Sequence, residues 1–254
     1  MNLENVLPMD IEKRSFEIIT EELGQLKLDP EKESVIKRVI HTSADFDYAR
    51  TLRFSEGVVE QTLEVLKKGG FTIVTDTNMA RTGINRSALM KLGGKAECFM
   101  SDPDVAARAK EAHSTRAAAC MEKAASLEGP VLIAVGNAPT ALVRLDELIR
   151  EGKIKPALVI GVPVGFVNVV QSKEIIMRSG VPYIVAVGRK GGSNVAAAIC
   201  NALMYKLTSA AQKNPTASKE RWREPPLWEA VAPPDGTICL PAGRQIVPIS
   251  LIPG

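Results

Sequence analysis

Short apolar runs that alternate with helical segments constrain the fold of this chain more than any other feature. The runs are FTIVTD (71–76), AECFM (96–100), VLIAVG (131–136), ALVIGV (157–162) and YIVAVG (183–188). A strand buried on both faces has an unbroken apolar sequence, whereas a strand with one wet face alternates apolar and polar residues. The segments between the runs, such as ALVRLDELIREG (141–152), have the spacing of amphipathic helices. We therefore predict an α/β fold with three α/β/α layers and a mostly parallel sheet.

Helical patterns also precede the first apolar run. In IEKRSFEIITEEL (11–23) and DPEKESVIKRVIH (29–41), apolar residues recur three or four positions apart, which is typical of a helix with one buried face. SEGVVEQTLEVLKKGG (55–70) has the same spacing, and its two final glycines indicate a helix end. We expect N-terminal helices, with His41 at the end of the second one.

The composition changes near residue 212. The segment 212–254 holds eight of the sixteen prolines and has no sustained helical or strand period. Because proline interrupts both helices and sheets, we predict an α/β domain over 1–211 followed by an irregular Pro-rich C-terminal extension that is extended or partly disordered. Alternatively, Trp222, Leu227 and Trp228 dock on the domain or on a partner chain.

Charge and cysteine spacing exclude several classes of function. The net charge is only +3, from 32 Lys and Arg against 29 Asp and Glu, so we expect no nucleic-acid partner. No apolar stretch approaches the roughly 18 residues of a membrane span, and the first residues lack a targeting pattern, so we expect a cytoplasmic protein without membrane contact. The cysteines are widely spaced, which predicts reduced thiols instead of a zinc site or a disulfide framework.

Polar loops follow the predicted strands. Their sequences are TNMARTGINR (77–86), NAPTAL (137–142), PVGFVNVVQSK (163–173) and RKGGSNVAAA (189–198). In a parallel sheet such loops meet at the carboxyl edge, where ligands of α/β proteins bind. Backbone N–H groups, helix N-termini and basic side chains there favour an anionic ligand. The glycines and prolines also fit simple turns and helix entries, and GRKGGS lacks the spacing of a phosphate-binding P-loop.

The stretch RVIHTSADFDYA (38–49) combines an arginine, a histidine, two aliphatic hydroxyls and two carboxylates. Histidine is the side chain that ordinarily titrates near neutral pH, and the chain has only His41 and His113. His41 is therefore a candidate acid or base. It could equally cap its helix or form a hydrogen bond inside the core.

Six motifs in order resemble one known family. They are SFEII (15–19), RVIHTSADFDYA (38–49), STRAAACME (114–122), GNAPTAL (136–142), GVPVGF (161–166) and GRKGGS (188–193). The resemblance is to the precorrin-8X methylmutase family and covers about residues 10 to 210. One departure is Gln171 in VQSKE, where the family pattern leads us to expect a glutamate.

The resemblance implies an isomerase that moves a methyl group from C-11 to C-12 of precorrin-8X or cobalt-precorrin-8. The product is hydrogenobyrinate or cobyrinate on the route to cobalamin. It further implies a homodimer that uses no cofactor and no metal, with His41 as the general acid. A sigmatropic shift needs neither a nucleophile nor a redox change, and protonation of a ring nitrogen by an imidazolium would assist it. Either substrate is compatible, because the shift does not involve the metal.

The implied substrate is a tetrapyrrole polycarboxylate, so its site must hold several negative charges. The cations that we assign to it are Arg38, Arg116, Arg189 and Lys190. The hydroxyl and amide candidates are Ser15, Thr42, Asn137, Thr140 and Ser193. Arg38 and Arg116 could instead pair with surface carboxylates, and any of the hydroxyls could cap a helix. Asp45 and Asp47 are expected to orient neighbours or cap a turn, since they would repel an anionic substrate.

Two other functions fit parts of the sequence. An α/β enzyme acting on a phosphorylated metabolite would use GRKGGS and GNAPT and would bind phosphate or a nucleotide. A tetrapyrrole carrier without catalytic activity would bind the macrocycle without converting it. A shift in visible absorption on mixing with the corrin product separates the phosphate enzyme from the other two.

Overall fold

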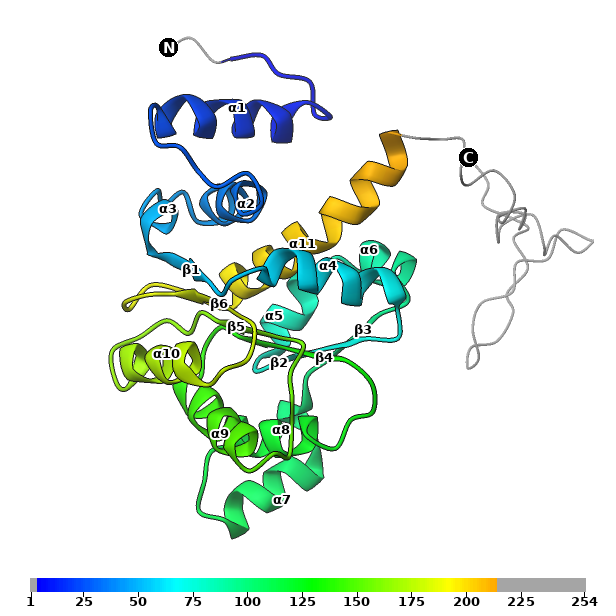
Figure 1. Ribbon diagram of the computed structural model, residues 1–254, viewed down its shortest axis with the longest axis vertical. Helices are drawn as coiled ribbons and strands as arrows, with labels where there is room; N and C mark the ends of the chain where they lie inside the picture. Colours follow the sequence, from blue (N-terminus) through cyan, green and yellow to red (C-terminus); the bar gives the residue numbers. More distant parts are fainter. Residues whose placement is uncertain (1–3, 214–254) are drawn as a thin grey trace, which may run out of the picture. The chain divides into compact units, whose positions relative to one another are not determined.

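The computed structural model describes the backbone of residues 4–213 and the side chains of residues 4–208, and it contains one six-stranded sheet (Figure 1). The spatial order is β1-β6-β5-β4-β2-β3. The strands are β1 (Leu52–Phe54), β2 (Thr72–Thr75), β3 (Lys95–Glu97), β4 (Val131–Val135), β5 (Leu158–Gly161) and β6 (Tyr183–Ala186). All neighbours pair in parallel except β1, which runs antiparallel to β6. The mostly parallel sheet is thus confirmed.

The five apolar runs each contain or overlap a strand, but two details differ from the prediction. β3 ends at Glu97, and the rest of AECFM turns into a short 3₁₀ helix at Phe99–Ser101. β1 was not predicted, because three residues with one buried, one exposed and one half-buried side chain give no apolar run. Its pairing with β6 is decided by contacts far along the chain.

Helices cover both faces of the sheet, which confirms the three-layer α/β/α prediction (Figure 1). One face carries α2 (Glu33–Ser43), α3 (Tyr48–Thr51), α4 (Val58–Lys68), α5 (Asn78–Gly83), α6 (Arg86–Lys91) and α11 (Ser193–Lys213). The other face carries α7 (Pro103–Glu111), α8 (Arg116–Ala124), α9 (Pro139–Arg150) and α10 (Val169–Arg178). The first helix, α1 (Ile11–Leu23), packs outside α2.

Strand β4 explains the unbroken apolar runs. All five of its side chains are buried. Leu132 and Ala134 belong to the core beneath α2 and α11, whereas Ile133 and Val135 belong to the core beneath α8 and α9. Side chains alternate between the two faces of a strand, so a strand with a core on each face needs apolar residues at every position.

The strand order contains a switch point beside β2. From β2 the chain moves outward to β3, and it then returns on the opposite side of β2 as β4. The loops after β2 and β4 therefore diverge, and ligands of open α/β sheets ordinarily bind at such a switch point.

Several sequence predictions concern residues 212–254. Helix α11 continues to Lys213, and the rest of the extension, with Trp222, Leu227 and Trp228, lies outside the described residues.

Cys98, Cys120 and Cys200 are buried free thiols. Within residues 4–213, no helix has the length and apolar character to cross a membrane.

Gly136, which directly follows β4, lies close against the start of α11. A Cβ atom on Gly136 would lie 2.6 Å from the Ser193 Cα and 2.7 Å from the Gly192 carbonyl oxygen. Both are backbone atoms, which cannot move aside as a flexible side chain can. At Gly161, the end of β5, the nearest atom would be a Val185 methyl carbon at 3.3 Å.

We predict that Gly136→Ala lowers the free energy of unfolding by about 1–3 kcal/mol through overpacking. Gly161→Ala serves as the matched control and should cost clearly less. Urea denaturation of both variants measures the difference. Equal losses for the two would contradict the close approach at Gly136.

Candidate active site

A buried carboxylate organises the switch point. Asp76 directly follows β2, and only 1% of its surface is exposed. Its Oδ1 accepts the N–H of Gly136 at 2.9 Å, and its Oδ2 accepts those of Asn137 at 2.8 Å and Ala138 at 2.7 Å. Burial raises the pKa of Asp76, and the amide donors oppose that rise. These N–H groups were expected to face an anionic ligand, but an internal anion already occupies them.

Hydroxyl contacts join further motifs at this edge. The Thr77 Oγ1 accepts the N–H of Ala80 and lies 2.8 Å from the Ser193 Oγ, so the loop after β2 is tied to the start of α11. The Thr115 Oγ1 lies 2.8 Å from the Thr140 Oγ1, which joins the N-termini of α8 and α9. The structure therefore brings STRAAACME, GNAPTAL and GRKGGS together.

A second buried charge holds the loop after β6. Lys173 lies on α10 with 1% exposure, and its Nζ donates to the carbonyl oxygens of Gly188 at 2.7 Å and Lys190 at 2.9 Å. Burial lowers the pKa of Lys173 to about 8. The same loop is joined to the loop after β5, because Gly192 N–H donates to the Val162 carbonyl at 2.9 Å.

The RVIHTSADFDYA segment meets this loop through Lys190. Its Nζ lies 2.7 Å from the Asp45 Oδ2 and 2.6 Å from the Asp47 Oδ2. The hydrogen bond from Lys190 lowers the pKa of Asp45, and the two carboxylates raise the pKa of Lys190. Asp45 and Asp47 thus orient a neighbour, as expected, and the charge of Lys190 is already balanced.

His41 lies in the last turn of α2 and is exposed. Its ring stacks on Phe16 of α1, with centroids 5.4 Å apart and planes 17° apart. Within the described part of the chain, no side-chain hydrogen bond involves its ring nitrogens. The alternative of a histidine bonded inside the core therefore does not fit.

The other predicted residues near His41 have local partners. Arg38 forms an ion pair with Glu12, and its guanidinium lies 4.8 Å from the Phe16 ring centroid and 5.1 Å from that of Tyr205. The Ser15 and Thr42 hydroxyls donate to backbone carbonyls four residues earlier in their own helices. Arg38 therefore pairs with a surface carboxylate, that of Glu12, which is the alternative given in the sequence analysis.

Arg116, Asn137 and Arg189 have exposed side chains at the carboxyl edge. Among the described residues, neither arginine forms a salt bridge. The Arg189 guanidinium lies 5.4 Å from the ring centroid of Phe166, which is 80% exposed in the loop after β5. The edge thus presents the guanidinium groups of Arg116 and Arg189, and that of Arg189 lies beside an exposed aromatic ring.

Comparison with known proteins identifies the family of this chain. A family model described as precorrin-8X methylmutase matches residues 10–206. The chain belongs to the precorrin-8X methylmutase family. The resemblance seen in the sequence is thereby confirmed, and the chain is an isomerase of cobalamin biosynthesis.

Curated relatives cover most of this methylmutase. It is 45% identical over 209 residues to the cobalt-precorrin-8 methylmutase of Salmonella typhimurium, which covers 80% of this chain and 97% of the relative. It is 39% identical over 196 residues to the precorrin-8X methylmutase of Pseudomonas aeruginosa, with 76% and 93% covered. A crystal structure of precorrin-8x methyl mutase from Thermus thermophilus has a TM-score of 0.72 and 40% identity, with 79% and 98% covered.

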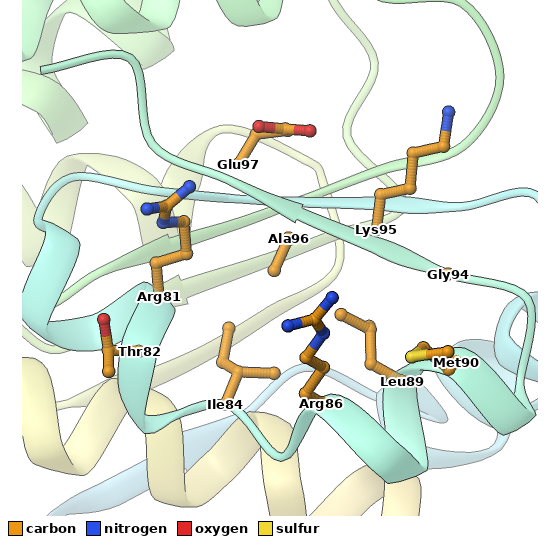
Figure 2. A pocket seen from close by; sticks show the side chains of 10 residues that line it. All are labelled: Arg81, Thr82, Ile84, Arg86, Leu89, Met90, Gly94, Lys95, Ala96 and Glu97. Carbon is orange, nitrogen blue, oxygen red and sulfur yellow. The ribbon is translucent and has the colours of Figure 1, made fainter. Parts of the chain in front are cut away.

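The methylmutase also has a groove at the edge strand β3, with a volume of about 540 Å³ (Figure 2). Arg81 of α5 and Arg86 of α6 lie on one side of it, and β3 lies on the other, with Ala96 pointing toward the helices and Lys95 and Glu97 pointing away from Arg86. Within residues 4–208, none of the three cations forms a salt bridge. The sequence analysis did not single out these residues, because each is an ordinary charged residue beside a helix or a strand.

Asp76 and Lys173 were also missed as functional residues. A signal existed for Asp76, since it is the one charge at the end of an otherwise apolar strand. Lys173 gave no local signal, because a lysine between polar residues of a helix ordinarily points to solvent.

Removing the Asp76 carboxylate should leave three N–H groups of the methylmutase without an acceptor. We predict that Asp76→Ala lowers the free energy of unfolding by about 3 kcal/mol, the usual scale for losing hydrogen bonds to a buried charge. Asp104→Ala is the control and should cost much less, because Asp104 on α7 is only partly buried and its main partner is the side chain of Lys123. Similar losses in urea denaturation would refute the role of Asp76.

The low pKa of Lys173 predicts a dependence of stability on pH. Between about pH 8, its pKa in the folded chain, and its ordinary value of 10.5, the unfolded chain holds a proton that the folded chain lacks. The free energy of unfolding of the wild type should therefore rise with pH over this window, relative to Lys173→Met. Urea midpoints at several pH values test this, and a constant difference between the two proteins would contradict it.

Proposed function

We propose that this chain moves a methyl group from C-11 to C-12 of precorrin-8X or cobalt-precorrin-8, giving hydrogenobyrinate or cobyrinate, with His41 as the general acid. The observation that carries the proposal is the exposed His41 imidazole at the end of α2, stacked on Phe16 and without a hydrogen-bond partner among the described residues. Membership of the methylmutase family supplies the class of reaction.

His41 suits a proton donor for chemical reasons. An imidazolium can release a proton near neutral pH, and protonating a ring nitrogen of the tetrapyrrole withdraws electron density from the carbon that carries the migrating methyl group. The Phe16 ring restricts the orientation of the imidazole while leaving both nitrogens available. General acid assistance of this kind accelerates a reaction by about 10² to 10⁴.

The substrate carboxylates require cations that are not already neutralised. Glu12 neutralises Arg38, and Asp45 and Asp47 neutralise Lys190, so these two cations form structural ion pairs. We therefore assign carboxylate binding to Arg116 and Arg189, whose planar guanidinium groups can each bind a carboxylate through two hydrogen bonds. Asn137 adds a neutral amide at the same edge.

The alternative of a phosphate-binding enzyme has less support. A Cβ atom on Gly191 would lie 2.0 Å from the Val162 carbonyl oxygen, and the Gly192 N–H already donates to that oxygen. The GRKGGS loop is thus packed against its neighbour and does not form a phosphate cradle. A carrier would bind the tetrapyrrole without converting it, so a measurement of turnover distinguishes it from the methylmutase. The homodimer and the cytoplasmic location belong to the same proposal and derive from the family resemblance.

Anaerobic single-turnover absorption with precorrin-8X and with cobalt-precorrin-8 tests the reaction. We expect the wild type to convert at least one substrate, and His41→Asn to bind it but convert it about 10² to 10⁴ times more slowly, because asparagine cannot donate the proton. His113→Asn replaces the other histidine and should behave as the wild type.

Each outcome has a separate meaning. Conversion by His41→Asn at the wild-type rate would eliminate His41 as the acid. Binding by the wild type without conversion would indicate a carrier, and the absence of binding to either tetrapyrrole would overturn the proposed substrate. The faster substrate of the wild type identifies the physiological route.

Substitution of cations tests where the carboxylates bind. Arg116→Ala and Arg189→Ala should each raise the Kd for the corrin product about tenfold, the effect of losing roughly 1.4 kcal/mol of binding energy. Arg86→Ala in the β3 groove is the matched control and should leave the Kd unchanged. Visible-absorption titration gives the values, and the reverse pattern would place the carboxylates in the groove.

A further inference from the structure

We propose that Lys173 and Lys190 together set the position of His41, acting as positioning residues through the Lys173–Lys190–Asp45/Asp47 linkage. This linkage runs from the interior of α10 to the loop after β6 and then to the segment that follows α2. The inference rests on the proposed role of His41, and its test includes a measurement that does not depend on turnover.

The first step is the fixed backbone of the loop after β6. The ammonium of Lys173 donates to the carbonyl oxygens of Gly188 and Lys190, which flank Arg189 on both sides. A buried ammonium is costly unless its hydrogen bonds are satisfied, so both carbonyls are held at defined positions. An apolar side chain would fill the same space at lower cost but could not hold the loop.

The second step is the side chain of Lys190. Its backbone is held by Lys173, and its ammonium contacts the carboxylates of Asp45 and Asp47. The Asp45 Oδ1 also accepts the N–H of Asp47 at 3.0 Å, so the two aspartates form one rigid turn. The Lys190 contacts thus fix this turn to the loop of the sheet.

The third step connects the turn to His41. Asp45 N–H donates to the Ser43 Oγ at 3.3 Å, and Ser43 is the last residue of α2. Ala44 joins the two in a left-handed conformation, with φ of 53°. His41 lies within the last turn of this helix, so a displacement of the aspartates moves the end of α2 and with it the imidazole.

A purely stabilising role is the competing explanation. The side chains of Lys190, Asp47 and Asp45 are 50%, 64% and 28% exposed, and ion pairs so open to solvent contribute little to stability. Lys190→Met should therefore fold normally. A structural role predicts no effect beyond stability, whereas a positioning role predicts a change at His41 in a folded protein.

The experiment compares Lys190→Met, Lys173→Met and the double variant with Lys123→Met. Lys123 is a matched control, because its ammonium also bridges two aspartates, Asp102 at 2.7 Å and Asp104 at 2.8 Å. The imidazole NMR signals of the two histidines report position directly, with His113 as the internal reference. Single-turnover rates and product Kd values are measured on the same full-length proteins.

We expect both single variants to shift the His41 signal, to leave that of His113 in place, and to lower the conversion rate about tenfold, within the scale of a small misplacement of a catalytic group. The double variant should lose no more than the worse single variant, because residues in one linkage are not additive. Lys123→Met should match the wild type in all three measurements.

An unshifted His41 signal in Lys190→Met, or a double variant that loses the product of the two single effects, would overturn the linkage. If Lys173→Met does not fold, Asp45→Asn combined with Asp47→Asn must reproduce the Lys190→Met shift, or the inference fails. A shifted His41 signal together with full activity of His41→Asn would refute the acid role but retain the linkage.

Discussion

The hydrogen bonds of the buried Asp76 carboxylate hold the loops at the carboxyl edge of this protein's sheet. The carboxylate accepts three successive backbone N–H groups from the loop after β4, at a point where the chain has reversed its direction across the sheet. Water cannot reach this group, so the amides must supply the stabilisation that solvent would otherwise give. With that loop fixed, Gly136 can pass close to α11, and Ser193 can contact Thr77.

Lys173 has the complementary role on the next pair of loops. Asp76 satisfies N–H donors with an internal anion, and Lys173 satisfies carbonyl acceptors with an internal cation. Both therefore occupy backbone groups that an external ligand could otherwise have used. Arg116 and Arg189 form no salt bridge among the described residues, and their charges lie at the ends of exposed side chains. For the tetrapyrrole that we propose as the substrate, such cations would bind the peripheral carboxylates at a distance from the reacting carbon.

His41 belongs to the same arrangement although it lies on a helix of the covering layer. The contacts of Lys190 with Asp45 and Asp47 join the segment after α2 to the loop after β6. Stacking on Phe16 joins α2 to α1. Phe16 contacts the imidazole directly, and in the linkage that we propose Lys190 positions it indirectly; neither contact uses its nitrogens. An acid that must protonate a bound substrate needs both properties, a fixed ring and an unoccupied nitrogen.

The sequence by itself determined the α/β class, the approximate positions of five strands, the helices before them and the family, because strand and helix periods and ordered motifs are local properties of the chain. It also placed His41 at a helix end. Only the tertiary structure decided which charges remain available. Lys190 and Asp47 are 143 positions apart, and no local pattern predicts that they meet. The same holds for Asp76 with the loop after β4 and for the pairing of β1 with β6. Hydrogen bonds and ion pairs act only over a few ångströms, so their partners are set when the sheet brings distant loops together.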